Sequence, residues 1–224
     1  MLSPEEKNLI INSMPFWQHL TAAEQDLFFE NTISVSYAKG AEIHNAMQEC
    51  AGILYVKEGT IRTYLLSDEG REVTLYRLEA DDICVLSASC VLQAIDFDVF
   101  VDADSDCQVL QLNAQTFAKL SAKNVYVELF SYKTATERFS DVMWAMQQIL
   151  FTSFDKRLAA FLIEESDKSG SNELKMTHEQ LAKYLGSARE VVSRMLKYFS
   201  KEGYLALSRG GITILDKKSL RKLL

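Results

Sequence analysis

The hydrophobic positions of this chain follow two different periods. Between about residues 33 and 112, apolar and polar residues alternate in short runs that end at turn residues, which is typical of half-buried strands. The runs are ISVSYAKG, GILYVKEG, TIRTYLLSDEG, EVTLYRL, FDVFVDAD and CQVLQL. About seven or eight short strands at this spacing predict a sandwich or a jelly-roll-like double-stranded β-helix.

Two short helices are predicted before these strands. Ser3 and Glu6 have the spacing of a capping box, in which a hydroxyl and a carboxylate satisfy free backbone amides, and Thr21 and Glu24 repeat it. Each pair therefore marks the start of a helix.

A second period, with alternating steps of three and four residues, runs from about Val125 to Leu150 and predicts one long helix. Its heptad positions form an apolar seam: Tyr132, Ala135, Phe139, Val142, Met146 and Ile149. Such a seam needs a partner, which is either the chain's own β-domain or a second copy of the chain. A second apolar edge at Leu129, Met143 and Leu150 supports a homodimer, because that edge would cover the β-domain while the seam meets the second copy.

The C-terminal part has the pattern of a winged helix-turn-helix. After a predicted hinge at FTSF come an amphipathic helix, FDKRLAAFLIEES, and a polar loop, DKSGSNE. Thr177 and Gln180 form a capping box that opens a helix ending at Gly186, a residue that suits a tight turn. Ser187 would cap the next helix, whose buried stripe is Val192, Met195, Leu196 and Phe199. The hairpin YLALSRGGITIL follows, with Arg209 at its turn.

Charged and polar side chains gather on the opposite face of that second helix. They are Arg189, Glu190, Ser193, Arg194 and Lys197. An arginine can donate two bonds to guanine and a glutamate can accept from cytosine, whereas a lysine neutralises phosphate. We therefore predict that this face reads DNA, with Thr177, His178 and Arg209 as further contacts. The alternatives are a solvated face with a Glu190–Arg194 pair, or a capping box that Glu190 completes with Ser187.

The charge distribution supports nucleic acid as the partner of this segment. The chain carries 24 Lys+Arg and 31 Asp+Glu, which is a formal net charge of -7. Residues 1–153 hold 10 and 22 of these (net -12), and residues 154–224 hold 14 and 9 (net +5), which together give -7. A polyanion is therefore repelled by the first part and attracted by the second.

Composition argues against several other classes of protein. No apolar run approaches the ~20 residues that span a bilayer, and no signal-peptide pattern opens the sequence, so we expect a cytoplasmic protein without a membrane partner. The four cysteines, Cys50, Cys84, Cys90 and Cys107, are irregularly spaced and contain no C-x-x-C pair. Neither a disulfide framework nor a structural metal site is indicated.

Nearly the whole chain resembles the Crp/Fnr family of bacterial transcription regulators. GSAREVVSRMLKYFSKEGYL is similar to the family's recognition helix and the start of its wing. YAKGAEIH and YVKEGTIRTYLLSDEGREVTLYRL are similar to its cyclic-nucleotide-binding β-roll, including Gly40, Gly59 and Gly70. The long helix is similar to the family's dimerisation helix.

The resemblance implies an α+β chain in three parts: a sensor β-roll at 1–122, a dimerisation helix at 123–151 and a winged helix-turn-helix at 152–224. It implies a homodimer without enzymatic activity that binds a palindromic double-stranded operator, with RNA polymerase as a further candidate partner. The positions matching the family's readers of a TGA-containing half-site are Arg189, Glu190, Ser193 and Arg194. A signal at the roll would change how the two long helices meet.

The sequence departs from the family at the sites that hold a cyclic nucleotide. Where nucleotide sensors carry a Gly-Glu pair and an Arg-Ser/Thr pair, this chain has Val85-Leu86 and Phe97-Asp98. Asp98 and Asp102 share the acidic outer face of the strand FDVFVDA, and we expect no cation to offset them, so a phosphodiester would be repelled. Cyclic AMP and cyclic GMP are therefore not expected. An iron-sulfur cluster is not expected either, because the cysteine cluster that the family's iron-sulfur members carry near the N-terminus is missing.

We predict instead a mostly apolar effector pocket that contains thiols. Its residues are Val85, Leu86, Phe97, Val99, Val142, Met143, Cys84 and Cys90. Cys84 and Cys90 are six residues apart, so an extended strand would place both on one face. Such a pocket is compatible with a small apolar ligand or with haem held partly by a thiolate. Ordinary buried packing of the thiols, and a regulator with no ligand at all, are the alternatives.

A rival from another class is a cupin-like ligand-binding protein or metalloenzyme, which has a similar roll. It would need two or three inward histidines with an acidic ligand. The chain has only His19, His44 and His178, of which one lies in the strand region. We therefore expect a DNA-binding regulator without a metal centre.

Overall fold

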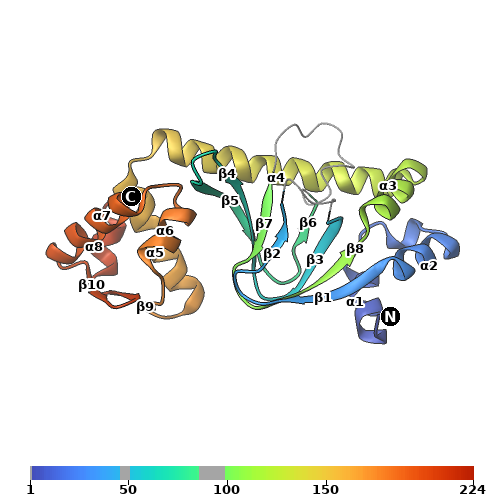
Figure 1. Ribbon diagram of the computed structural model, residues 1–224, viewed down its shortest axis with the longest axis horizontal. Helices are drawn as coiled ribbons and strands as arrows, with labels where there is room; N and C mark the ends of the chain where they lie inside the picture. The colour runs from blue at the N-terminus through green and yellow to red at the C-terminus, as the bar shows by residue number, and fades with distance from the viewer. Residues whose placement is uncertain (1, 46–50, 86–98) are drawn as a thin grey trace. The chain divides into compact units, whose positions relative to one another are not determined.

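The computed structural model describes residues 2–45, 51–85 and 99–224 (Figure 1). The chain divides into two compact units: Met1–Leu65 with Leu75–Val142, and Leu66–Thr74 with Met143–Leu224. The long helix continues across the boundary between Val142 and Met143. The division into three parts with boundaries at residues 122 and 151 stays a prediction.

The N-terminal unit contains two four-stranded sheets, which confirms the predicted roll (Figure 1). The first sheet has the order β1 (Thr32–Tyr37), β8 (Cys107–Leu112), β3 (Ile53–Glu58) and β6 (Ile83–Cys84). The second has the order β2 (Glu42–His44), β7 (Phe100–Ala103), β4 (Ile61–Leu66) and β5 (Glu72–Leu78). Apolar side chains between the strands form the core of the roll because successive residues point to opposite faces.

Strand β7 shows this alternation, and it also corrects one expectation. Val101 and Ala103 are buried, whereas Asp102 is half-buried on the other face, as the sequence pattern predicts. The predicted absence of an offsetting cation was wrong, because Arg62 on the neighbouring strand β4 donates to Asp102 through Nε at 3.0 Å and through a second nitrogen. Arg62 is only 3% exposed and its guanidinium lies 4.1 Å from the centre of the Tyr64 ring.

Short helices close one end of the roll. They are α1 (Pro4–Ser13), a 3₁₀ turn (Trp17–His19), α2 (Ala22–Glu30) and α3 (Ala114–Lys123), and the sequence pattern had not indicated α3. Both predicted capping boxes, at Ser3 and at Thr21, are present. Apolar residues of these helices, including Phe16, Phe28 and Phe117, form one buried cluster with β3 and β8.

Helix α4 (Val125–Phe151) is longer by one residue than the sequence predicted. Its buried residues, Val127, Ser131 and Thr134, face the roll. Ala135 and Val142 of the predicted seam also pack, partly buried, against the clusters of the roll. Seven exposed apolar positions form a row at heptad spacing, interrupted by Thr136, which keeps three residues of the predicted seam: Val125, Leu129, Tyr132, Phe139, Met143, Met146 and Leu150. Tyr126, Trp144 and Phe151 are exposed outside this row. Leu129, Met143 and Leu150 were expected to cover the β-domain but are exposed. Ala135 and Val142 were expected to meet a second copy but pack against the roll.

The C-terminal unit is built around one apolar cluster that includes Leu158, Leu181, Leu196 and Phe199. Its elements are α5 (Phe154–Ser169), β9 (Glu173–Leu174), α6 (His178–Tyr184), α7 (Arg189–Lys201), β10 (Leu205–Ser208), β11 (Gly211–Ile214) and α8 (Lys217–Arg221). The sequence pattern missed β9, which makes the predicted hairpin a three-stranded sheet of order β10-β11-β9.

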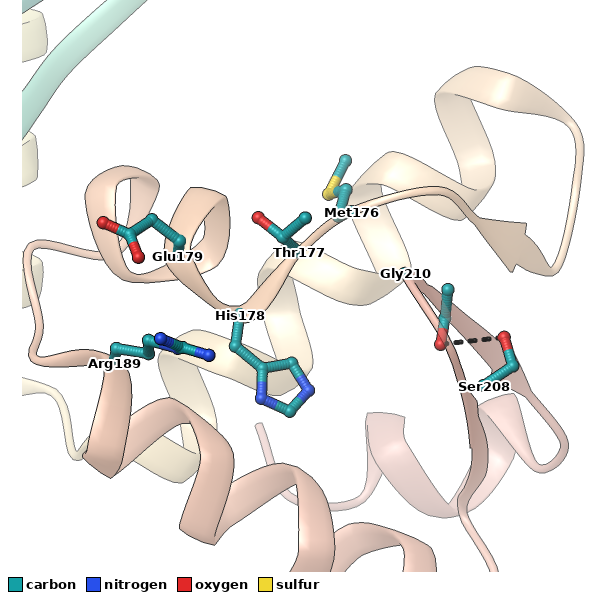
Figure 2. A pocket seen from close by; sticks show the side chains of 8 residues that line it. Met176, Thr177, His178, Glu179, Arg189, Ser208 and Gly210 are labelled. Carbon is teal, nitrogen blue, oxygen red and sulfur yellow. Dashed lines mark hydrogen bonds between the residues drawn. The ribbon is translucent and has the colours of Figure 1, made fainter.

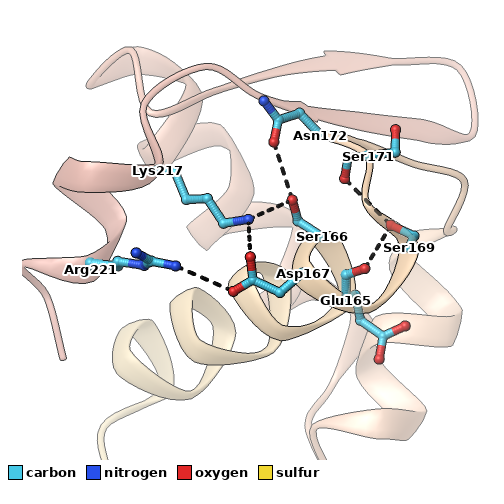
Figure 3. Close-up of polar contacts among 8 residues, drawn as sticks. All are labelled: Glu165, Ser166, Asp167, Ser169, Ser171, Asn172, Lys217 and Arg221. Carbon is cyan, nitrogen blue, oxygen red and sulfur yellow. Dashed lines mark hydrogen bonds and ion pairs between the residues drawn. The ribbon is translucent and has the colours of Figure 1, made fainter.

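Helix α8, which the sequence pattern also missed, is fastened to the end of α5 by charge (Figure 3). Lys217 Nζ lies 2.7 Å from Asp167 Oδ1 and donates to the buried Ser166 hydroxyl at 2.9 Å. Arg221 reaches the second oxygen of Asp167 at 3.3 Å. These contacts hold α8 against the C-terminal part of α5.

An ion pair between α1 and the roll predicts a pH-dependent stability. Glu6 accepts from Lys57 Nζ at 2.8 Å and from the Ser3 amide at 2.9 Å, and these bonds lower the Glu6 pKa from 4.5 to about 2. A lowered folded-state pKa stabilises the fold above the unfolded value of 4.5, and this contribution is lost as the pH falls toward 2.

We therefore expect Glu6→Gln to lower the free energy of unfolding by about 1 kcal/mol at pH 7, with a difference from wild type that shrinks below pH 4.5. Urea unfolding at several pH values measures this. Glu5→Gln is the control, since it removes a charge from the same helical turn without breaking the Lys57 pair. A pH-independent difference for Glu6→Gln would contradict the account.

Candidate nucleic-acid interface

The first helix of the helix-turn-helix is held at both ends. At its start, the Thr177 hydroxyl accepts from the Gln180 amide at 3.1 Å and the Gln180 side chain accepts from the Thr177 amide at 2.9 Å, so the predicted capping box is confirmed. At its end, Arg157 of α5 donates to the Leu185 carbonyl at 2.6 Å. Burial lowers the pKa of Arg157, which remains a cation at neutral pH. Gly186 then adopts a φ of 56°, the left-handed conformation that the predicted turn requires.

The second helix, α7, begins one residue later than the sequence suggested. Its N-cap is Ala188, which has no side-chain cap, whereas the amide of Ser187 donates to the Ala182 carbonyl at 2.9 Å. The expectation that Ser187 caps this helix was therefore wrong. The predicted apolar stripe is confirmed, since Val192, Leu196 and Phe199 are fully buried and Met195 is partly buried against the same cluster.

All five side chains predicted on the outer face of α7 line one open groove of about 390 Å³. They are Arg189, Glu190, Ser193, Arg194 and Lys197. Within the residues that the structure describes, no ion pair joins Glu190 to Arg194. The charged ends on this face are therefore open to a partner.

A second depression, of about 330 Å³, lies between the two helices and the wing (Figure 2). It is lined by Met176, Thr177, His178, Glu179, Arg189, Ser208, Gly210 and Gly211. The structure thus brings the predicted residues Thr177, His178 and Arg189 together beside the wing. Arg209 is exposed in the two-residue turn between β10 and β11, where Gly210 has a φ of 78°.

The predicted effector pocket is only partly described. Leu86, Phe97 and Cys90, like Asp98, lie outside the described residues. The others are placed as follows: Cys84, Val85 and Val99 are buried, Val142 is partly buried and Met143 is exposed. Cys84 and Val99 belong to one cluster of the roll, with Val142 packed against it, whereas Val85 belongs to the cluster beneath the short helices.

The sequence analysis missed three polar groups beside this cluster. Thr63 and Tyr76 are buried strand residues, and Arg138 lies on the roll-facing side of α4. Residues of these types in strands and helices are ordinary, so the sequence contained no signal for them. Only the fold shows that they meet.

The described residues indicate neither a metal centre nor a membrane span. Within residues 2–45, 51–85 and 99–224, no group of three or more His, Cys, Asp or Glu side chains is placed to hold a metal ion. His19, His44 and His178 belong to three separate elements. None of the helices in these ranges combines the length and the hydropathy of a membrane-spanning segment.

Comparisons with known proteins agree with this architecture. Residues 34–124 match the model of the cyclic nucleotide-binding domain, and residues 156–223 match the model of the Crp-like helix-turn-helix domain. A crystal structure from Eubacterium rectale, described as a regulator of the Crp/Fnr family, is 47% identical, covers 95% of this chain and 98% of its own, and superposes with a TM-score of 0.91. The chain belongs to the Crp/Fnr family.

Curated relatives of this Crp/Fnr protein are more distant. The fumarate and nitrate reduction regulatory protein of Escherichia coli is 26% identical over 198 residues, which cover 83% of this chain and 76% of the relative. The transcriptional regulator SdrP of Thermus thermophilus is 26% identical over 174 residues, which cover 75% and 81%. The chain is a transcription regulator with a DNA-binding helix-turn-helix, and the predicted fold class is confirmed.

The turn between α6 and α7 provides a test of the geometry. A methyl group at Gly186 would lie 3.3 Å from the side chains of Ile149 and Val73, and the new residue would have to keep the backbone φ of 56°. We expect Gly186→Ala to lower the free energy of unfolding by about 1–2 kcal/mol and to weaken DNA binding below the unfolding temperature.

The matched control is Gly170→Ala, since Gly170 has a φ of 63° but nothing within 4 Å of an added methyl group. It should cost a similar or smaller amount of stability and leave DNA affinity unchanged. Calorimetry and fluorescence anisotropy measure the two quantities. Equal loss of DNA affinity in both variants would show that the turn does not position α7.

Proposed function

We propose that this Crp/Fnr regulator acts as a homodimer on a palindromic double-stranded operator, with one α7 in the major groove of each half-site. The observation that supports this most is the groove along α7, where two arginines, a glutamate, a serine and a lysine are presented together beside a buried apolar stripe. RNA polymerase is the protein partner that we expect for such a regulator on DNA.

Base readout is assigned to Arg189, Glu190, Ser193 and Arg194. The guanidinium groups match the acceptor pair of guanine, and the carboxylate matches the amino group of cytosine. Lys197 lies one turn beyond Arg194 on the same groove and contacts phosphate.

Phosphate contacts are also assigned to the depression beside the wing. Thr177 and His178 begin α6 next to Arg189, and Arg209 is exposed at the tip of the wing. Contacts from two helices and a hairpin fix the orientation of α7 on the duplex, because phosphate contacts set register without reading sequence.

The exposed row of α4 is assigned to the dimer. Seven apolar side chains at heptad spacing are left in water by a single chain, and a second copy of the same helix covers them by a two-fold interface. Dimerisation through α4 also presents two copies of α7 to the two arms of a palindrome.

The signal at the roll is not a cyclic nucleotide. The buried guanidinium of Arg62 is already engaged by Asp102, and the partly buried guanidinium of Arg138 by Asp141 and Asp82. A phosphodiester would therefore meet these carboxylates before it reached a free cation.

Three variants on α7 separate base readout from phosphate binding. On an operator selected from random duplex DNA, we expect Glu190→Ala and Arg194→Ala each to weaken binding by about 1–3 kcal/mol and to relax the preference at one base pair. Lys197→Ala should weaken all sequences alike and reduce the salt dependence.

Lys218→Ala on α8 is the control, because it removes a basic residue that does not line the groove of α7. Affinities for the operator and its single-base variants decide the question. Unchanged base preference in both Glu190→Ala and Arg194→Ala would remove the readout assignment.

A charge in the exposed row of α4 tests the dimer. Phe139, which is 63% exposed in a single chain, would be buried between two copies, so Phe139→Asp should give monomers that lose most operator affinity. Ser140→Asp adds the same charge one residue away from the row and should remain dimeric. Sedimentation velocity distinguishes the species, and a dimeric Phe139→Asp protein would place the interface elsewhere.

A further inference from the structure

The tip of the hairpin between β4 and β5 is part of the C-terminal unit. Its residues, Leu66–Thr74, group with the helix-turn-helix, although both strands belong to the second sheet of the roll. The Gly70 amide donates to the Ser67 carbonyl at 2.8 Å, and the Ser67 amide donates to the Arg71 carbonyl at 2.9 Å. Gly70 has a φ of 77°, which suits this tight turn. The side chains that follow the turn therefore start from a closed backbone.

Three polar side chains of this tip contact the end of α6, the first helix of the helix-turn-helix. The Thr74 hydroxyl donates to the Lys183 carbonyl at 3.0 Å, and the Arg71 guanidinium donates to the Gly186 carbonyl. The carboxylate of Glu72 lies 2.8 Å from Lys183 Nζ in an ion pair. The last carbonyls of a helix depend on donors from outside the helix. The hairpin tip supplies two of these donors to α6 and the turn after it.

Two further contacts surround the same turn. A β-carbon added at Gly186 would lie 3.3 Å from Val73, so Val73 packs closely against the turn. Arg157 of α5 donates to the Leu185 carbonyl at 2.6 Å. Burial lowers the pKa of Arg157 and the charge of Arg71 lowers it further, so the two guanidinium groups lie near each other. The carbonyl oxygens at the end of a helix attract such cations, and the turn is held by both of them.

The turn determines the direction in which α7 begins. Ala188, two residues after Gly186, is the N-cap of α7, and Arg189 is the first residue of that helix. The apolar cluster already holds α6 against α7 through residues such as Leu181 and Val192. The contacts of the hairpin tip fall instead on the turn and on the last residues of α6. Their loss should leave the fold intact and change the direction of the first turn of α7, where recognition helices contact bases.

We propose that Arg71, Glu72 and Thr74 are positioning residues for DNA binding, which fix the turn of the helix-turn-helix and thereby the direction of α7. They act through the backbone of the turn and do not touch DNA themselves. The proposal rests on the proposed function, because it takes α7 as the helix that reads the operator. It adds residues from the first half of the sequence to the determinants of operator recognition.

The ion pair between Glu72 and Lys183 allows a test by charge exchange. The quantity measured is the ratio of the affinity for the selected operator to the affinity for a scrambled duplex of the same length. Glu72→Lys adds positive charge, which by itself would tighten binding to every duplex. If the tip positions α7, Glu72→Lys and Lys183→Glu should each lower the ratio by about fivefold to tenfold. The double exchange restores the pair and the wild-type net charge, and it should return the ratio to within about twofold of wild type.

Glu69→Lys is the matched control. Glu69 is exposed on the same tip and makes none of the contacts with α6 described above. The variant adds the same charge as Glu72→Lys, so it should leave the ratio unchanged. A ratio that falls as far in Glu69→Lys as in Glu72→Lys would assign the effect to charge and overturn the proposal.

The Thr74 hydroxyl provides a test without any change of charge. Thr74→Val removes the donor to the Lys183 carbonyl and keeps the shape of the side chain, whereas Thr74→Ser keeps the donor. We expect Thr74→Val to lower the ratio by about threefold to tenfold and Thr74→Ser to bind as wild type does. Fluorescence anisotropy at a temperature well below unfolding, with the active fraction determined by stoichiometric titration, measures both affinities.

The outcomes distinguish positioning from loss of the fold and from failure of the proposed function. Equal losses of affinity for the operator and the scrambled duplex would assign the tip a structural role only, and an unchanged ratio in Glu72→Lys and Thr74→Val would remove it from DNA binding. Either result overturns the proposal. The variants of Glu190 and Arg194 test the reading face independently. If those relax base preference while the hairpin variants have no effect, the reading face stands and only the role of the tip fails.

Discussion

Helix α4 packs against the roll on one face and exposes a row of large apolar side chains on another, and the proposed dimer depends on this division. One face lies on the roll through Val127, Ser131 and Thr134, which are buried. Another face keeps large apolar side chains in water, with Tyr132 and Phe139 each about three-fifths exposed. An exposed apolar row of this length is unusual on a monomer and is typical of a protein–protein interface.

The same helix links sensing to DNA binding in this account. Arg138 faces the roll, with its guanidinium 5.4 Å from the centre of the Tyr76 ring, whereas the next residue, Phe139, belongs to the exposed row. A change at the roll therefore reaches the helix whose other face is assigned to the second copy in the proposed dimer. A ligand shifts the regulator toward its DNA-binding state only by its difference in affinity for the two arrangements of α4. In the proposed dimer, the separation of the two recognition helices depends on how the two α4 helices pack.

The sequence predicted the features that depend on local periodicity. The three capping boxes, the six longer strands and the stripe of α7 follow from residues that are close together in the chain, and the structure confirms them. Strand β9 has only two residues, and α8 only five, which is too short for either period to be recognised.

Features that depend on distant residues could not be predicted. The Arg62–Asp102 pair requires the register of β4 against β7, 40 residues away, and the sequence therefore suggested unpaired aspartates. The seam of α4 was assigned to Ala135 and Val142 because both edges of the helix are apolar, and only the fold shows which edge the roll covers. Thr63, Tyr76 and Arg138 meet only through the tertiary fold, so no spacing in the sequence singled them out.

Selection of random duplex DNA by the full-length protein, followed by sequencing of the bound pool, tests the central claim most directly. If two copies of α7 are presented by a dimer of α4, the enriched sequences form an inverted repeat whose half-sites are centred about 10 base pairs, one helical turn, apart. Inserting about half a turn between those half-sites should reduce the affinity to that of a single half-site. Enrichment of a single asymmetric motif, or binding that is indifferent to the inserted spacing, would contradict the account.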